Sequence, residues 1–256
     1  MQLILLGVGS SAGTPVIGCH CATCASTDPR NSRTRCSAAV VAPGGEVILI
    51  DTGPDLRQQA LREGLNRVDA VLYTHTHADH LHGIDDLRSF CQLNRTQIPL
   101  YGCKEHMDVI AARFAYTLRT PGEYGDYWDL PVLSSNLVDG PFELFGLQII
   151  PIAVKHGRAN ILGYRIGNLA YLTDVSEIPD ESMQLLQGLD VLLLDCLRYK
   201  PHHTHINLEQ SLAYAERIAA GNTYLIHMTH ELEYAEVSAN LAACVHVGYD
   251  GLKLNF

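Results

Sequence analysis

Hydrophobic residues occur along the chain in short runs, separated by glycine, proline and polar residues. Runs of this kind, rich in Val, Ile and Leu, predict buried β-strands. In the first third of the chain, strands are expected at residues 3–7, 37–42, 46–51 and 69–74. Further strands are expected at residues 146–154, 163–167, 169–174, 191–195, 223–227 and in the final GLKLNF.

Apolar residues between these runs return at helical spacing. Helices are expected over residues 54–62, 84–93, from Lys104 onward, and over 181–187, 208–219 and 231–242. The alternation of strands and helices predicts an α/β fold in which helices cover the sheets. The sequence contains no repeat and no linker, so residues 1–256 are interpreted as one domain.

The least regular part of the chain follows the helix expected from Lys104. Residues 120–130, TPGEYGDYWDL, are rich in glycine and aromatic residues. Such a stretch is typical of a surface loop, here over a functional site. We interpret residues 104–130 as a helical and loop insertion that shapes a substrate pocket.

Composition and charge narrow the class of protein. The chain has 256 residues, of which 47% are hydrophobic, which is typical of a folded globular protein. Its apolar runs are shorter than the roughly 20 residues that span a bilayer, and no basic segment precedes the apolar N-terminus. We therefore expect a cytoplasmic protein without a membrane partner. The net charge of −10 disfavours nucleic acid as a partner.

Four side chains that can bind metals follow the strand expected at 69–74, in the sequence YTHTHADH. In extended chain, residues two apart point the same way, so His75 and His77 can converge on one ion. Asp79 and His80 come after the chain turns and should face a different direction. The spacing predicts one pair for each of two neighbouring metal ions.

More metal ligands are expected at the ends of other strands. His156, Asp174 and His227 each lie where a strand leaves the sheet, the usual place for functional residues in α/β folds. Asp195 ends the strand VLLLD in the same manner. Position alone leaves Asp174 and Asp195 as competing candidates. Asp51 ends the strand EVILID, where it is either a turn residue or a residue behind the site.

The chain contains eight cysteines, and three of them are close together in GCHCATC. In a reducing compartment, Cys19, Cys21 and Cys24 indicate a thiolate metal site that lacks a fourth ligand. The others are expected to be small buried hydrophobic residues: Cys36, Cys91, Cys103, Cys196 and Cys244.

At this point the sequence resembles a known family. HTHADH resembles the HxHxDH signature of the metallo-β-lactamase superfamily, and His156, Asp174 and His227 follow in that family's order. The resemblance implies a four-layer αββα sandwich with a dinuclear site at one edge. GTPVIGCHCATC resembles the subgroup with the phosphodiesterase of the carbon–phosphorus lyase pathway, which opens phosphoribosyl 1,2-cyclic phosphate.

The resemblance assigns roles to the candidate residues. It implies one metal held by His75, His77 and His156, a second held by Asp79, His80 and His227, and Asp174 bridging both. It places Asp51 behind the ligands, where it would orient them. It also implies a structural zinc held by Cys19, Cys21, Cys24 and His230. The expected cofactors are thus two catalytic divalent ions, zinc or manganese, and one structural zinc.

The implied activity is hydrolysis of small phosphodiesters, cyclic or linear, derived from sugars or nucleotides. Two divalent cations lower the pKa of a bridging water and so supply hydroxide at neutral pH. His205, in PHHTHINLEQ, matches a catalytic histidine of the subgroup and would protonate the leaving oxygen. Asp79 is the other expected catalytic residue, and no role is assigned to His202 or His203.

The sequence is also compatible with other activities. An acyl hydrolase acting on a thioester, lactone or lactam could use the same scaffold. A non-catalytic carrier or accessory protein, like the pyrroloquinoline quinone biosynthesis B group with its similar cysteine cluster, would keep only the zinc. A tRNA-processing nuclease fits the chemistry but not the net charge. The expected partner is a small phosphodiester, and a homodimer is compatible with the sequence.

Overall fold

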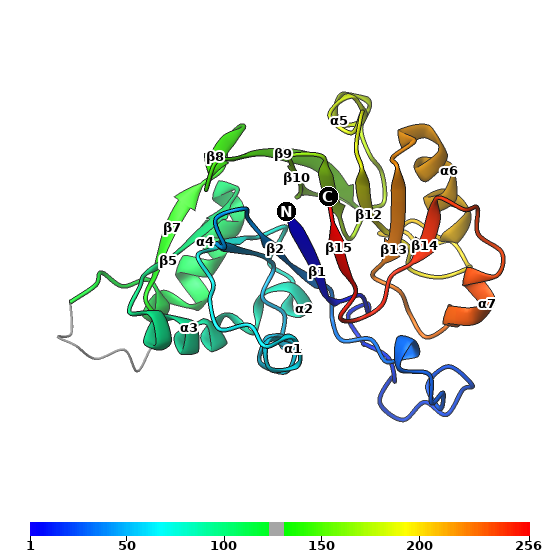
Figure 1. The fold of residues 1–256 in the computed structure, drawn as a ribbon, viewed down its shortest axis with the longest axis horizontal. Helices are drawn as coiled ribbons and strands as arrows, with labels where there is room; N and C mark the ends of the chain where they lie inside the picture. The colour runs from blue at the N-terminus through cyan, green and yellow to red at the C-terminus, as the bar shows by residue number, and fades with distance from the viewer. Residues whose placement is uncertain (123–130) are drawn as a thin grey trace.

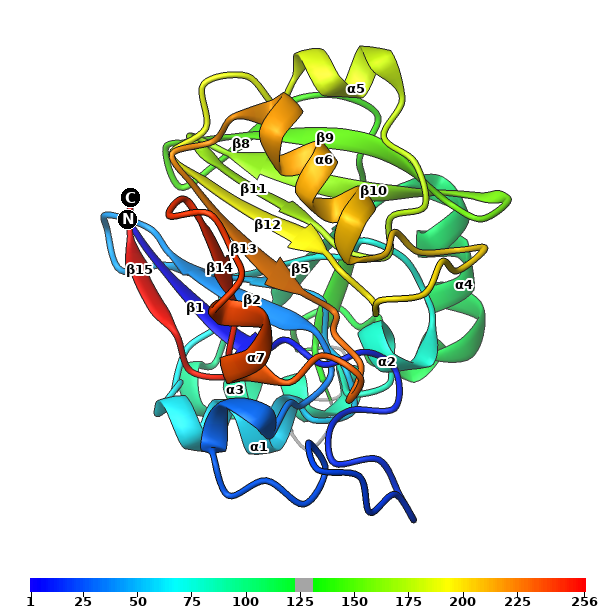
Figure 2. The same ribbon diagram turned by 90° about the vertical axis from the view of Figure 1, so that its right-hand side faces the viewer.

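The computed structural model describes residues 1–122 and 131–256. Within these residues, two seven-stranded sheets pack face to face and helices cover their outer faces (Figures 1 and 2). The four-layer αββα sandwich expected from the sequence is therefore confirmed.

The first sheet has the strand order β15-β1-β2-β3-β4-β5-β7. Its strands are β1 (Gln2–Gly7), β2 (Ser37–Val41), β3 (Val47–Ile50), β4 (Ala70–Leu72), β5 (Ile98–Gly102), β7 (Leu133–Leu137) and β15 (Lys253–Asn255). From β3 to β7 neighbouring strands are parallel. Their carboxyl ends consequently meet at one edge of the sheet.

The second sheet has the order β14-β13-β12-β11-β10-β9-β8. Its strands are β8 (Phe142–Leu144), β9 (Leu147–His156), β10 (Ala159–Ile166), β11 (Leu169–Leu172), β12 (Val191–Asp195), β13 (Asn222–Ile226) and β14 (Val245–Val247). From β11 to β14 neighbouring strands are parallel. This sheet therefore also gathers several strand ends at one edge.

Successive residues of a strand point to opposite faces of the sheet, and this alternation places them in different layers of the core. In β1, Leu3 and Leu5 face the second sheet and join the core between the sheets, which also contains Tyr164 and Leu193. Ile4 and its neighbours on the same face pack instead beneath the helices of the first sheet. Because both faces of these strands are buried, their sequences are hydrophobic throughout.

Seven α-helices occur in the described part of the chain. Those that follow strands of the first sheet are α1 (Leu56–Glu63), α2 (Ala78–Leu81), α3 (Leu87–Asn94) and α4 (Lys104–Arg113), and the later ones are α5 (Asp180–Gln184), α6 (Leu208–Ile218) and α7 (Tyr234–Ser238). Short 3-10 helices are η1 (Pro29–Asn31), η2 (Ile84–Asp86) and η3 (Ala115–Thr117). The segment between β1 and β2 extends away from the sandwich (Figures 1 and 2).

Some expected elements differ from those in the structure. The helix expected over 231–242 is wrong at both ends, because α7 covers only Tyr234–Ser238. The chain first has to turn after β13, and Glu233 then caps the helix by accepting a hydrogen bond from the Glu236 N–H. Strands β5, β7, β8 and β14 were not expected, since most of them are short or half-exposed.

The first part of the expected insertion is helical and forms α4 and η3, whereas residues 118–122 are not helical. Most of the loop expected at 120–130 lies outside the described residues. In the parts of the chain that are described, no helix is long and apolar enough to cross a membrane.

Candidate dinuclear metal centre

Two groups of metal-binding side chains meet where strands of both sheets end. His75 and His77 follow β4, His156 ends β9, and Asp174 and His227 follow β11 and β13. Helix α2 contributes the remaining two residues. In each group the ligand atoms lie within 4.8 Å of one another; the groups are His75, His77, His156 and Asp174, and Asp79, His80, Asp174 and His227. The structure thus brings together all seven residues expected at this site.

Asp174 belongs to both groups, and each of its oxygens faces one of them. Oδ1 lies 3.8 Å from Nε2 of His75 and 4.0 Å from Nε2 of His156. Oδ2 lies 3.1 Å from Nε2 of His80 and 3.4 Å from Nε2 of His227. This position fits a carboxylate that bridges two cations.

The inward-facing nitrogens lie near carboxylate oxygens but make no hydrogen bonds within the described residues. Nε2 of His75, His80 and His227 is buried and has no hydrogen bond in the described structure. A buried polar atom without a partner costs about 1–3 kcal/mol. Bound cations would satisfy all three nitrogens, so the residues fit the divalent metals that this arrangement requires.

Hydrogen bonds from behind set the orientation of two of these rings. Asp51 accepts hydrogen bonds from Nδ1 of His80 at 2.7 Å and from the Thr74 hydroxyl at 2.7 Å. Because the Thr74 hydroxyl donates to Asp51, it accepts from Nδ1 of His75, 3.0 Å away. Both Nδ1 atoms therefore carry protons, and the Nε2 lone pairs point inward. Asp51 makes the contacts expected of a residue that orients the ligands.

His156 and Asp79 are held in different ways. Nδ1 of His156 donates to the Thr204 carbonyl at 2.9 Å. The backbone at Asp79 packs on Gly53, where an added Cβ would come within 2.2 Å of the Asp79 carbonyl oxygen. Only glycine allows this approach, so Gly53 fixes the distance between α2 and the turn after β3.

Three site residues have left-handed backbone conformations. Asp51, Asp174 and His227 have φ values of 62°, 57° and 59°. Each such residue costs roughly 1–3 kcal/mol and persists only where surrounding contacts enforce it. All three come just after a strand, so the turn directs each side chain across the edge of the sheet.

The charges of the cluster depend on each other. Burial alone would raise the pKa of Asp174, but the imidazoles of His227 and His80 outweigh it and hold this pKa well below its usual range. Burial would lower the pKa of His80, yet Asp174 and Asp51 raise it well above the usual range. By contrast, burial together with His80 holds the pKa of His75 well below that range. Divalent cations would take the place of the protons that the carboxylates hold on the imidazoles.

Asp195 lies behind the site and does not replace Asp174. Its Oδ1 is 3.3 Å from Nδ1 of His227 and 3.3 Å from Nδ1 of His205, and it accepts a hydrogen bond from the Asp174 N–H at 3.2 Å. From the sequence, the two aspartates are competing candidates for one role, and this arrangement is not predicted. The position of Asp195 at the end of a buried strand is the feature of the sequence that points to a role near the site.

His205 is buried, with 9% of its surface exposed, and its Nε2 lies 3.8 Å from Oδ1 of Asp174. Its ring stacks on that of His227, with 4.9 Å between centroids. His202 is half-buried and His203 is exposed. Of the three histidines in this loop, His205 is therefore the one placed against the candidate metal ligands.

The cysteine cluster forms a separate group. Sγ of Cys19, Cys21 and Cys24 lies 3.3, 3.3 and 3.4 Å from Nδ1 of His230. One imidazole nitrogen cannot satisfy three thiols, whereas a tetrahedral zinc with usual bond lengths would separate sulfur from nitrogen by roughly 3.5 Å. A hydrogen bond from the Cys24 N–H lowers the pKa of Cys21 to about 6, which favours a thiolate. The four residues fit one zinc ion.

Fold and site together define a metal-binding hydrolase, and comparison with known proteins gives its family. The model of the beta-lactamase superfamily domain matches residues 46–228, and the chain belongs to the metallo-β-lactamase superfamily. The crystal structure of a diphosphatase from the PhnP family is similar to this chain, with 44% identity, a TM-score of 0.91 and coverage of 100% of this chain and 97% of that one.

Two further similar proteins have names that differ from that of the diphosphatase. An octanoyltransferase from Porphyromonas gingivalis is 39% identical over 99% of this chain, but the chain spans only 51% of that protein. Zinc-bound PqqB from Methylobacterium extorquens has a TM-score of 0.80 at 21% identity, with 100% of both chains covered. At that identity the likeness shows the fold alone.

Proposed function

We propose that the chain hydrolyses small phosphodiesters, and that the ions it binds at the candidate dinuclear centre are zinc or manganese. The proposal rests on the position of His205, whose Nε2 lies beside Asp174 and whose Nδ1 faces Asp195. A proton donor at this place suits a phosphodiester, whose alkoxide leaving group needs a proton. The similarity to a PhnP-family diphosphatase at 44% identity supports phosphorus chemistry.

The proposed roles follow from the contacts. His75, His77 and His156 would hold one cation, Asp79, His80 and His227 the other, and Asp174 both. Together the bound cations would supply a nucleophile at neutral pH and offset the charge that develops on the phosphoryl group. His205 would give its Nε2 proton to the leaving oxygen while Asp195 stabilises the ring through Nδ1.

Acyl chemistry is the main alternative, because a relative of about twice the length is named an octanoyltransferase. Roughly half of that protein lies outside the part that matches this chain, so its named activity is not assigned to the shared half. A cytoplasmic location and a homodimer are both compatible with this proposed activity.

A substrate screen tests the proposal. Metal-replete protein is supplied with bis-p-nitrophenyl phosphate, a phosphoribosyl cyclic phosphate, a thioester and a lactam. We expect turnover of the phosphodiesters and its loss after removal of metal by a chelator. Turnover of the thioester or lactam without turnover of any phosphodiester would contradict the proposal and favour acyl hydrolysis.

A further inference from the structure

Arg33 carries a charge but lies buried in the fold, with only 1% of its surface exposed. In the described part of the chain its guanidinium forms no ion pair, and its Nε has no hydrogen bond. Burial lowers the pKa of this group to about 10. Because a buried charge without an ionic partner makes a fold less stable, stability alone does not account for an arginine at this position.

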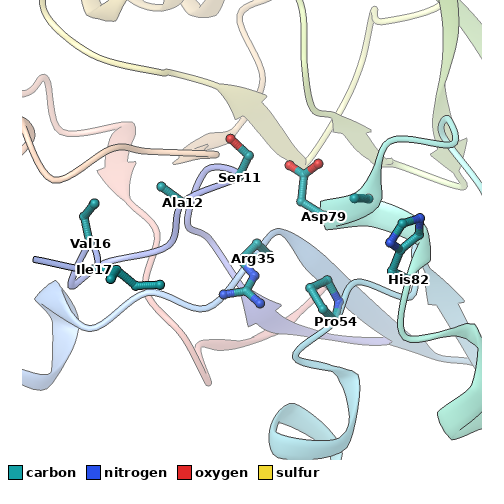
Figure 3. Close-up of a pocket in the computed structure, with 9 residues that line it drawn as sticks. Ser11, Ala12, Val16, Ile17, Arg35, Pro54, Asp79 and His82 are labelled. Carbon is teal, nitrogen blue, oxygen red and sulfur yellow. The ribbon is translucent and has the colours of Figure 1, made fainter.

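The next arginine on the same segment is placed differently. Figure 3 shows Arg35 in the open pocket that Asp79 also lines, and its Nε pairs with Oδ2 of Asp55 at 2.9 Å. The side chain of Arg35 is 29% exposed. Arg35 therefore keeps contact with water, whereas Arg33 makes its contacts inside the protein.

The guanidinium of Arg33 binds one loop of the chain, residues 228–232. Its Nη1 donates to the Thr229 carbonyl at 2.8 Å, and its Nη2 donates to the Leu232 carbonyl at 2.6 Å. Nη2 also donates to Oδ1 of Asn31 at 3.3 Å. One rigid, planar group thus holds two carbonyls of the loop, which fixes both the position and the direction of the chain between them.

This loop joins the two groups of candidate metal ligands. It begins directly after His227 of the dinuclear centre, and it contains His230 of the cysteine cluster. The left-handed backbone of His227, with a φ of 59°, persists only where surrounding contacts enforce it. Arg33 supplies one of those contacts, because the carbonyl of Thr229 is only two residues beyond His227.

Both partners of this contact are fixed from other sides. The Thr229 N–H donates to the Leu197 carbonyl at 2.9 Å, so both backbone polar groups of Thr229 are bound. The backbone of Arg33 exchanges two hydrogen bonds with that of Thr14, of 2.7 and 2.8 Å. The guanidinium is therefore anchored independently of the loop that it holds.

We propose that Arg33 is a positioning residue for the dinuclear centre, which holds the loop after β13 so that His227 keeps the orientation needed to bind a cation. Arg33 does not touch the reacting atoms, and it acts through the loop and His227. The inference rests on the proposed function in one respect, since it takes His227 as a ligand of one of the two cations.

Manganese binding at the dinuclear centre tests this role without any substrate. Protein that holds zinc in the cysteine cluster and no other metal is titrated with Mn²⁺, and free Mn²⁺ is measured by electron paramagnetic resonance. In Arg33→Met, both loop carbonyls lose their donor while an unbranched side chain still fills the space. We expect the affinity of the dinuclear centre for Mn²⁺ to fall about 10- to 100-fold, with zinc still bound by the cysteine cluster.

Arg30→Met is the matched control, because Arg30 belongs to the same segment but pairs with Asp28 at the surface. It should bind Mn²⁺ as tightly as the wild-type protein does. Arg33→Lys keeps the charge but has one ammonium group in place of the fork, so we expect an affinity between those of Arg33→Met and wild type. Equal affinities in Arg33→Met and Arg30→Met would overturn the inference. A loss of affinity that is reversed by refilling the cysteine cluster with zinc would also overturn it, since Arg33 would then support only that cluster.

Two further outcomes have their own measurement. If Arg33→Met does not fold, Arg33→Lys is compared with Arg30→Met, and equal Mn²⁺ affinities would overturn the inference. If the wild-type protein binds no Mn²⁺ beside its zinc, the proposed function is contradicted, and amide hydrogen exchange over residues 228–232 then decides the role of Arg33. We expect faster exchange there in Arg33→Lys than in Arg30→Met. Equal exchange in the two variants would overturn the inference.

Discussion

Replacement of Asp195 by Asn tests whether this residue orients the site. Oδ1 of Asp195 faces Nδ1 of both His227 and His205, and Oδ2 is buried without a partner in the described structure. If the new amide nitrogen takes the place of Oδ2, it has no acceptor. If it takes the place of Oδ1, it faces three N–H groups, those of His227, His205 and the Asp174 backbone, and repels them. Either orientation removes the negative charge behind both rings.

The size of the effect follows from these contacts. A buried donor without an acceptor costs about 1–3 kcal/mol of unfolding free energy. Changes to residues that orient metal ligands typically lower metal affinity or activity by about 10- to 100-fold. We expect both effects in Asp195→Asn, with metal lost from the candidate dinuclear centre but retained by the cysteine cluster.

The assay combines metal analysis, thermal unfolding and phosphodiester turnover. Asp190→Asn is the control, because Asp190 lies exposed just before β12 while Asp195 ends the same strand. Wild-type metal content and activity in Asp195→Asn would refute the role of this residue. Loss of stability alone, with metals and turnover intact, would show that Asp195 supports only the fold.

Three further substitutions test other parts of the account. His205→Ala should keep its metals but lose roughly 10²- to 10⁴-fold in rate on diesters with poor leaving groups, and much less on p-nitrophenyl esters; an equal loss on both would mean that His205 binds substrate or metal. Cys24→Ser should lose one zinc and unfold at lower temperature, and unchanged zinc content would exclude the cysteine site. The Gly53→Ala variant should be less stable by about 1–3 kcal/mol and bind metal more weakly, because its new Cβ meets the Asp79 carbonyl. Gly140→Ala is the control, since open space surrounds that residue, and equal stability of the two variants would count against the close approach at Gly53.

Much of the site could be predicted because its residues follow strands. Hydrophobic runs locate β4, β11 and β13 from sequence, and parallel strands bring their carboxyl ends to one edge. The histidines and aspartates that follow those runs therefore meet, even though His75 and His227 are far apart in sequence. Asp174 and Asp195 could not be told apart by this argument, since both lie at the carboxyl ends of strands in the same sheet. The structure separates them, because Asp174 faces Nε2 atoms of the candidate ligands whereas Asp195 faces Nδ1 atoms from behind.

Other features depend on contacts between distant segments. The helix expected over 231–242 begins late because the chain after β13 first brings His230 to the cysteine cluster. The pairing of Arg35 with Asp55 and the packing of Gly53 on Asp79 are also tertiary. Neither leaves a periodic pattern in the sequence. Short strands such as β14, with three residues, give too little alternation to be recognised.

We propose that a dinuclear centre bridged by Asp174 hydrolyses phosphodiesters. To test this proposal, metal ions are counted while bis-p-nitrophenyl phosphate turnover is measured, first in protein purified without chelator and then during stepwise metal removal. We expect about two ions per chain beyond the one held by the cysteine cluster, with turnover falling as those two are removed. Undiminished turnover in protein that has lost both ions would contradict this proposal.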